Sequence, residues 1–192
     1  MSNLKDFSQI IEKLEQICLN IYPKSGSHDW NHIQRVRKLC LQIGKQLNAD
    51  LLVLEAAALL HDISHQLREK HAERSSVEAE KILREVGFPE EKIPKVVDAI
   101  REHSFSSGLK PQSLESKILS DADKLDALGA IGIYRAIAYS IEHGRSINGF
   151  VEHVFEKLLK LPEYMETEIG RKLAAQRARF LRDFVDRLLK EI

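Results

Sequence analysis

Apolar residues recur along the first part of the chain at the three- and four-residue spacing of one face of an α-helix. Segment 4–21 shows this pattern, and its apolar face consists of Phe7, Ile10, Ile11, Leu14, Ile17, Cys18 and Ile21. A second segment, from about Asp29 to Asn48, repeats the pattern with Ile33, Val36, Leu39, Cys40 and Ile43. We predict an amphipathic helix over each segment, and Asp29 and Ser27 are expected to form the N-terminal cap and first turn of the second.

The next segment, 50–62, differs because it has no polar face. Residues Leu51 to Leu60 are apolar except for Glu55, which is typical of a helix buried on most sides. This helix runs directly into His61 and Asp62, and His65 follows one turn later. A core helix that ends in titratable side chains needs partners for them, because burying polar or charged groups is costly.

Helical patterns continue to the C-terminus, separated by polar or glycine-containing segments. We predict a loop at 64–74, and Ser75 with Glu78 predicts a capping box for a fourth helix that ends before Gly87. Gly129 and Gly132 predict a close helix contact or a break within the helical stretch that surrounds them. The other predicted elements are a turn at 88–93, a helix to about 102, a loop at 104–112, helical structure over 113–143 that stops at Gly144, and helices at about 150–159 and 167–189.

No segment shows the alternating pattern of a β-strand, so we predict an all-α helical bundle of about seven to nine helices. The chain has 192 residues and is 43% hydrophobic, which is enough for one sizeable core. We therefore predict a single domain over 1–192, although the length would also permit two.

Charge and composition exclude several classes of protein. Lys plus Arg and Asp plus Glu both total 29, so the chain lacks the cationic field of a nucleic-acid or membrane-surface binder. No segment reaches the ~18 apolar residues of a membrane span, and the N-terminus is amphipathic, unlike a signal peptide. Cys18 and Cys40 each lie in an apolar helical pattern, which favours buried thiols in a reducing compartment. We expect a cytoplasmic protein.

Histidine and aspartate carry the candidate chemistry. Six of the eight histidines fall in one part of the chain: His28, His32, His61, His65, His71 and His103. His28 and His32 are four residues apart, as are His61 and His65, so each pair shares a face if it is helical. Farther along the chain, Asp121, Asp123 and Asp126 adjoin apolar positions of a predicted helix.

A divalent metal is the most economical partner for these side chains. Imidazole and carboxylate together suit Mn, Fe, Co, Ni or Zn. Such a metal acidifies a bound water and neutralises charge on a phosphoryl oxygen, so hydrolysis is the natural reaction. The sequence has no Gly-rich phosphate loop, no G-x-S-x-G elbow and no H-E-x-x-H motif.

Structural interpretations stay open for each group taken alone. The pair His61–Asp62 would also fit a helix C-terminus complemented by an imidazolium. The three aspartates would also fit a solvated stripe with Lys117 and Lys124, and Lys124 is expected to be exposed. Single histidines such as His71, His143 and His153 are more often structural than functional.

Three strings of sequence carry a family resemblance. They are SHDWNHIQRV around His32, AALLHDIS around His61 and Asp62, and ILSDADKLDALGAIGIYRA around Asp123. This order, H…HD…D, resembles the HD-domain superfamily of metal-dependent phosphohydrolases. The downstream string FEKLLKLPEYMETEIGRKLAAQRARF is also similar to the C-terminal part of one bacterial and archaeal subgroup, so the resemblance extends from about Ser27 to the end of the chain.

The resemblance implies a ligand set and a nucleophile. It assigns one divalent transition metal to His32, His61, Asp62 and Asp123, and a metal-bound hydroxide oriented by Asp62 would attack phosphorus. Asp123 is chosen because the family ligand stands just before a K/R-L pair, which leaves Asp121 and Asp126 as supporting or substrate-contacting candidates. Members with two metals use extra histidines, for which His103 and then His71 are the best placed.

His65 marks a departure from the family pattern. Some nucleotidase members have a glutamate three residues after the HD aspartate, and this chain has His65 there. A neutral imidazole could accept a proton from water or could help to hold the site, so His65 is the candidate general base. The candidate substrate contacts are His28, Arg35 and His103, and Arg35 would either pair with a site carboxylate or grip a phosphate.

The sequence thus predicts one HD domain with a core at 27–145 and helical extensions at 1–22 and 146–192. Its expected reaction is hydrolysis of a phosphate ester or phosphoanhydride in a small phosphorylated molecule, a nucleotide in the favoured form. Pyrophosphate release from a nucleoside triphosphate is the specific form that the subgroup implies, and a nucleotide monophosphatase is the near alternative. A nucleotide-binding regulatory module without turnover and a diiron oxygenase are the alternatives of other classes. A homodimer is allowed, and the sequence leaves the oligomeric state, the base, the sugar and the metal open.

Overall fold

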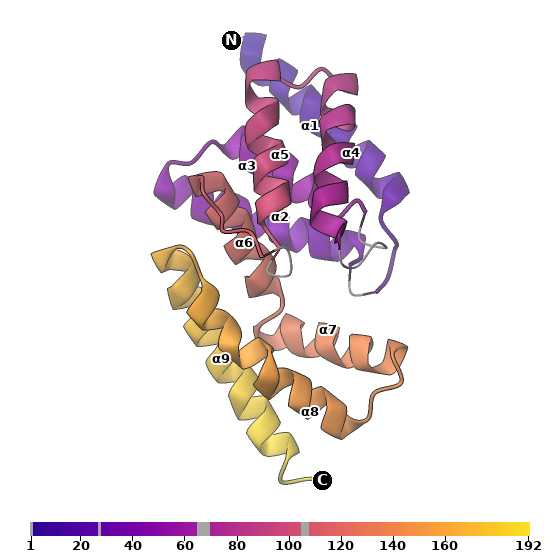
Figure 1. The fold of residues 1–192 in the computed structure, drawn as a ribbon, viewed down its shortest axis with the longest axis vertical. Coiled ribbons are helices and arrows are strands. Elements are labelled where there is room, and N and C mark those ends of the chain that lie inside the picture. The colour runs from indigo at the N-terminus through magenta and orange to yellow at the C-terminus, as the bar shows by residue number, and fades with distance from the viewer. Residues whose placement is uncertain (1, 27, 65–69, 105–107) are drawn as a thin grey trace. The chain divides into compact units, whose positions relative to one another are not determined.

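A computed structural model describes residues 2–26, 28–64, 70–104 and 108–192 (Figure 1). Within these ranges the chain forms nine α-helices, two short 3-10 helices and no strand. The all-α prediction is confirmed. The helices are α1 (Ser2–Ile21), α2 (Trp30–Leu47), α3 (Leu51–Leu60), α4 (His71–Glu85), α5 (Ile93–Glu102), α6 (Leu114–Asp126), α7 (Gly129–Glu142), α8 (Ile147–Glu156) and α9 (Glu168–Leu188).

The chain divides into two compact units, Met1–Ser120 and Asp121–Ile192, and the boundary falls within α6. The prediction of a single domain over 1–192 stays a prediction. Among the residues described, no helix is both long enough and apolar enough to span a lipid bilayer.

Helix α3 is the centre of the first unit and packs against α1, α2 and α5. Its buried side chains include Ala56, Ala57 and Ala58, whose small size lets the neighbouring helices approach closely. Leu54, Leu59 and Leu60 are also fully buried. A helix enclosed in this way has little freedom to move, so the residues that follow Leu60 are held in a defined position.

Two aspartates determine where α2 and α3 begin. The side chain of Asp29 accepts a hydrogen bond from the backbone N–H of His32 at 2.8 Å, which confirms Asp29 as the cap of α2. Asp50 caps α3 in the same way through Val53. Between the two helices, Asn48 adopts the left-handed conformation, with φ of 54°, and ends α2. These caps place His32 in the first turn of α2.

Helix α4 begins earlier than the sequence indicates. It starts at His71, so the predicted loop over 64–74 is wrong from residue 71 onward and Ser75 is not its cap. Ser75 lies inside the helix, where it is buried and its hydroxyl accepts a hydrogen bond from the N–H of Ser64 at 3.1 Å. The buried face of this first part is made of small residues such as Ala72 and Ser75, which leave no hydrophobic period in the sequence.

The second unit contains α7, α8, α9 and the 3-10 helix η4 (Leu158–Tyr164), while the other 3-10 helix, η2 (Glu90–Lys92), lies in the first unit. Helix α7 packs against α8 and α9, and η4 packs against both α8 and α9. The break expected near Gly129 and Gly132 is confirmed, because Gly129 has φ of +72° and a Cβ on Gly132 would lie 2.3 Å from the carbonyl oxygen of Ala127.

Candidate metal centre

Helix termini of the first unit supply the candidate metal ligands. His61 and Asp62 follow the last residue of α3, and His32 lies in the first turn of α2. His103 follows the last residue of α5, and His71 is the first residue of α4. Side chains at helix ends can point away from the helix body, so the packing of these helices brings the polar groups to one place without breaking the apolar core.

His32, His61 and Asp62 form a triangle of donor atoms. The Nε2 atoms of His32 and His61 are 3.4 Å apart, and they lie 3.6 and 3.7 Å from Oδ2 of Asp62. Donor atoms around a tetrahedral metal with bonds of roughly 2.1 Å are separated by roughly 3.4 Å. The structure therefore brings three of the predicted ligands together at spacings that fit a divalent metal, and their role as ligands stays a prediction.

The end of α3 sets the tautomer of His61. Its Nδ1 lies 2.9 Å from the carbonyl oxygen of Ala58, and because a carbonyl can only accept, Nδ1 carries the proton. A neutral His61 then presents the lone pair of Nε2 to the site, as a metal ligand must. His103 repeats the device at the end of α5, where its Nδ1 lies 2.6 Å from the carbonyl oxygen of Ile100. In both cases a helix terminus supplies the acceptor, because its last carbonyls lack partners within the helix.

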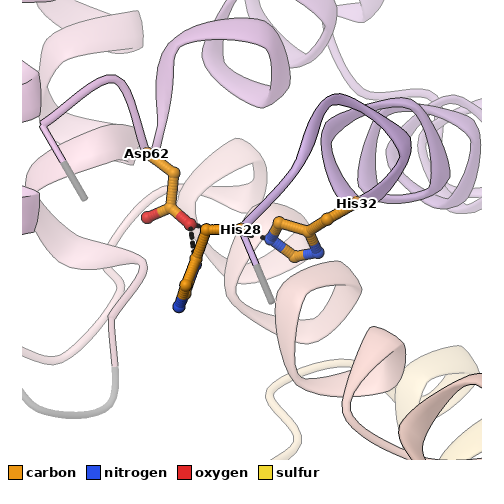
Figure 2. A group of neighbouring side chains, drawn as sticks. All are labelled: His28, His32 and Asp62. Carbon is orange, nitrogen blue, oxygen red and sulfur yellow. Dashed lines mark hydrogen bonds and ion pairs between the residues drawn. The ribbon is translucent and has the colours of Figure 1, made fainter. Parts of the chain in front are cut away.

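Asp62 is held as a carboxylate although it is only 2% exposed. Burial acts to raise the pKa of Asp62, but the neighbouring imidazoles of His61, His28 and His32 hold it well below its usual range, the last two through hydrogen bonds. The closest of these donors is Nδ1 of His28, 2.7 Å from Oδ2 (Figure 2). The side chain of His28 is 44% exposed, so the predicted substrate contact lies between Asp62 and solvent.

Two further histidines line the same site. His103 is buried, its ring centroid is 5.1 Å from that of His61, and donor atoms of His61, Asp62 and His103 all lie within 4.8 Å of one another. His71 reaches the site from α4, with Nε2 3.8 Å from Oδ1 of Asp62. Taken alone, His71 favoured a structural interpretation. Only the early start of α4 shows that it faces the HD pair.

The remaining predicted site residues are placed as follows. Arg35 is partly exposed on α2, one turn beyond His32. Asp123 is partly exposed on α6, in the second unit. His65 lies outside the described residues, as does Ser27 before α2. The roles of Arg35, Asp123 and His65 stay predictions.

The charged groups that flank Asp123 in sequence are buried, which corrects the expectation for Lys124 and argues against one alternative for the aspartates. Lys124 is buried rather than exposed, and Asp121 and Asp126 do not form a solvated stripe. Burial lowers the pKa of Lys124, while the charges of Asp121, Asp123 and Glu166 act in the opposite direction. Lys124 was expected to be exposed because successive residues of a helix point about 100° apart, which directs it away from Asp123. That direction is solvent-exposed only if no other part of the chain covers that face of the helix, and here the face is covered. Asp126 forms an ion pair with Arg135 at 3.0 Å.

Comparison with known proteins identifies the family. The HD domain family matches residues 29–128. Over its whole length the chain is similar to the uncharacterized protein YpgQ of Bacillus subtilis, with 36% identity over 200 residues that cover 96% of YpgQ. The chain belongs to the HD domain family. As a member of this superfamily of metal-dependent phosphohydrolases it is a hydrolase, which confirms the predicted family and enzyme class.

Solved structures of relatives share this architecture. The crystal structure of YpgQ in complex with ADP has a TM-score of 0.79 and 34% identity, and it covers 100% of this chain and 97% of that one. An HD-superfamily hydrolase from Bacillus thuringiensis has a TM-score of 0.79 and 32% identity, with coverage of 96% and 97%. The chain is also 29% identical over 176 residues to a tRNA (cytidine(56)-2'-O)-methyltransferase of Thermoplasma volcanium, covering 83% of this chain and 48% of that longer protein.

Proposed function

We propose that this protein hydrolyses a nucleotide at a divalent transition metal held by His32, His61, Asp62 and Asp123. One observation carries the proposal: the buried triangle of His32, His61 and Asp62, whose donor atoms are 3.4 to 3.7 Å apart. Asp123 completes the set by the family resemblance. Imidazole and carboxylate donors suit Mn, Fe, Co, Ni or Zn.

The donor set fits such a metal in its chemistry as well as in its spacing. When bound, a divalent cation would lower the pKa of water and offset negative charge on a phosphoryl oxygen. The Nε2 atoms of His32 and His61 lie within hydrogen-bond distance of each other at 3.4 Å, and a bound cation would replace the proton between them. The hydrogen bond from Nδ1 to the carbonyl of Ala58 favours the tautomer of His61 whose Nε2 presents a lone pair to such a cation.

Asp62 and the side chains around the triangle have the remaining roles, which are to orient water, to hold the carboxylate and to contact the substrate. Asp62 stays ionised and can accept a hydrogen bond from the attacking water, which orients a lone pair of that water toward phosphorus. His28 donates to Asp62 Oδ2 and so holds the carboxylate in one rotamer. The Nδ1 of His103 is hydrogen-bonded to the carbonyl oxygen of Ile100, so its Nε2 faces the substrate or a second cation. Arg35 is the proposed phosphate contact and His65 the proposed general base.

A nucleotide is the proposed substrate because the relative YpgQ has been crystallised in complex with ADP. In the specific form that we favour, water attacks the α-phosphorus of a nucleoside triphosphate and pyrophosphate leaves. A nucleotide monophosphatase would use the same centre on a phosphate monoester. A binding module without turnover would keep the nucleotide but leave it intact.

The test combines metal content with product analysis. The purified protein is analysed for bound metals, stripped with a chelator and restored separately with Mn, Fe, Co, Ni or Zn. Each form is then assayed with a panel of nucleoside mono-, di- and triphosphates, with phosphate and pyrophosphate quantified separately. We expect pyrophosphate from triphosphates. Release of phosphate from monophosphates at a rate equal to that of pyrophosphate from triphosphates would favour the phosphatase. No turnover with any metal would leave only the binding module.

Labelled water identifies the bond that breaks. In ¹⁸O-water, attack at the α-phosphorus places the label in the nucleoside monophosphate, whereas attack at the β-phosphorus places it in pyrophosphate. Asp98→Asn is the matched control for variants of the centre, because Asp98 is an exposed aspartate of the same unit that pairs with Arg101 on α5. Its turnover and label distribution are expected to match those of the unaltered protein.

A further inference from the structure

The carbonyl groups of Ala58, Leu59 and Leu60 stand immediately before the HD pair, and each of the three accepts a hydrogen bond. The carbonyl of Ala58 accepts from Nδ1 of His61, and that of Leu60 accepts from the N–H of Ile63 at 3.4 Å. The carbonyl of Leu59 accepts two hydrogen bonds from farther away in the sequence: from the hydroxyl of Tyr22 at 3.0 Å and from the thiol of Cys18 at 3.3 Å. Side chains thus satisfy the carbonyls of Ala58 and Leu59, which would otherwise lack partners at this helix terminus.

Tyr22 and Cys18 lie outside the part of the chain that matches the HD domain family. The match covers residues 29–128, whereas Cys18 belongs to α1 and Tyr22 follows its last residue. Both side chains are buried. The N-terminal helix therefore does more than cover apolar surface, because it delivers two polar atoms to the turn that carries His61 and Asp62.

The hydroxyl oxygen of Tyr22 also contacts the backbone of Asp62, the residue that follows His61. Burial, with the charges of Cys18 and Asp62, raises the pKa of Tyr22 well above its usual value, and a hydrogen bond from the backbone N–H of Asp62 acts in the opposite direction. The hydroxyl of Tyr22 therefore donates to the carbonyl of Leu59 and accepts from the backbone N–H of Asp62. One hydroxyl links the residues on both sides of His61.

We propose that Tyr22 is a positioning residue for the metal centre: its hydroxyl fixes the turn that carries His61 and Asp62. This inference rests on the proposed function. Ligand atoms must be held within about 0.5 Å of their productive positions for a centre to bind its metal tightly. The backbone bond from Ile63 to Leu60 is long, so the shorter bond from Tyr22 restrains this turn more strongly.

The test separates positioning from simple packing. Tyr22→Phe removes only the hydroxyl and keeps the ring, whose centroid is 6.4 Å from that of Trp30. Ile11→Val is the matched control, because Ile11 is a buried residue of α1 and the change removes one methyl group without touching the carbonyl of Leu59. We expect both variants to lower thermal stability slightly, so stability alone cannot distinguish the two roles.

Binding of Mn²⁺ to the metal-free protein is the first measurement. We expect Tyr22→Phe to weaken Mn²⁺ affinity by about tenfold, as loss of a supporting hydrogen bond does at other metal centres, and to lower kcat by about as much with KM within about twofold. Ile11→Val should match the unaltered protein. Unchanged Mn²⁺ affinity in Tyr22→Phe overturns the inference.

Hydrogen exchange of the metal-free protein is the second measurement. Peptides that contain residues 60–63 should exchange faster in Tyr22→Phe than in Ile11→Val, and equal protection in the two variants counts against the positioning role. The unaltered protein shows which proposal has failed. If it binds Mn²⁺ no better than a His61→Ala variant, the proposed metal centre is wrong and the inference falls with it. If the unaltered protein binds Mn²⁺ and Tyr22→Phe behaves like Ile11→Val, the metal centre stands and only the positioning role of Tyr22 is wrong.

Discussion

Two buried aspartates, one in each unit, show how differently the same side chain can be used. Asp62 in the first unit is 2% exposed and Asp121 in the second is 0% exposed. Asp62 is surrounded by imidazoles, with His28 at 2.7 Å and His32 at 3.6 Å from its Oδ2. Asp121 accepts from the backbone N–H groups of Glu166 and Thr167 at 2.7 and 2.8 Å and from the Thr167 hydroxyl at 2.7 Å.

The partners determine what each carboxylate can do. The pKa of Asp62 is held well below its usual range, whereas burial raises the pKa of Asp121 and outweighs the hydrogen bonds that it accepts. Imidazoles can exchange a proton for a metal, but peptide N–H groups cannot. Asp121 is further enclosed by the start of α9, since a Cβ on Gly170 would lie 2.2 Å from its Oδ2. We infer that Asp62 serves chemistry and that Asp121 serves the fold, so burial by itself does not identify a catalytic acid.

The largest expected effect is that of Asp62→Asn. The amide lacks the charge that a cation requires, so we expect turnover to fall by about 10³-fold or more with loss of bound metal. Helical content measured by circular dichroism should survive, because Asp62 lies beyond the end of α3. His61→Ala is expected to behave in the same way. Turnover within tenfold of the unaltered protein in both variants would remove the basis of the comparison.

His65→Ala tests whether His65 is the general base, a group that takes a proton from water without binding the metal. We expect kcat to fall by about 10²-fold, which is typical for loss of a general base. Metal content measured on the purified variant should stay unchanged. If turnover is also unchanged, His65 has a structural role and the proton must go elsewhere.

Asp121→Asn should show the opposite pattern to Asp62→Asn. Asparagine has one acceptor oxygen in place of two, so a backbone N–H at the start of α9 loses its acceptor at a cost of about 2 kcal/mol in the free energy of unfolding. Urea unfolding followed by circular dichroism measures this loss. At a temperature where the variant is folded, kcat should stay within about threefold. A large loss of turnover without loss of stability would assign Asp121 to the site instead.

Gly170→Ala tests the close contact between Gly170 and the Asp121 carboxylate, and it has the smallest expected effect. The added methyl group must displace the Asp121 carboxylate, at a cost of about 1 to 2 kcal/mol. In a background of Asp121→Ala the same change should cost at least about 0.5 kcal/mol less, because the group that it displaces is gone. Equal costs in the two backgrounds would show that Gly170 is needed for another reason.

The local features of the fold could be predicted from sequence because their causes are local. Helical periodicity located most of the helices, and the cap at Asp29 needed only the neighbouring backbone. The start of α4 was missed because small buried residues such as Ala72 and Ser75 carry no hydrophobic signal. The burial of Lys124 was missed because it depends on what covers the helix.

The sequence by itself determined the helical class, the family and the kind of chemistry, since imidazole and carboxylate side chains in the order H…HD…D limit the metals and the reaction. Tertiary structure decided which of these side chains meet. His71 joins the site, Asp121 turns toward α9, and Tyr22 reaches a carbonyl 37 residues away. Such contacts depend on how whole helices pack against one another, and packing sums many weak apolar interactions that no local motif encodes.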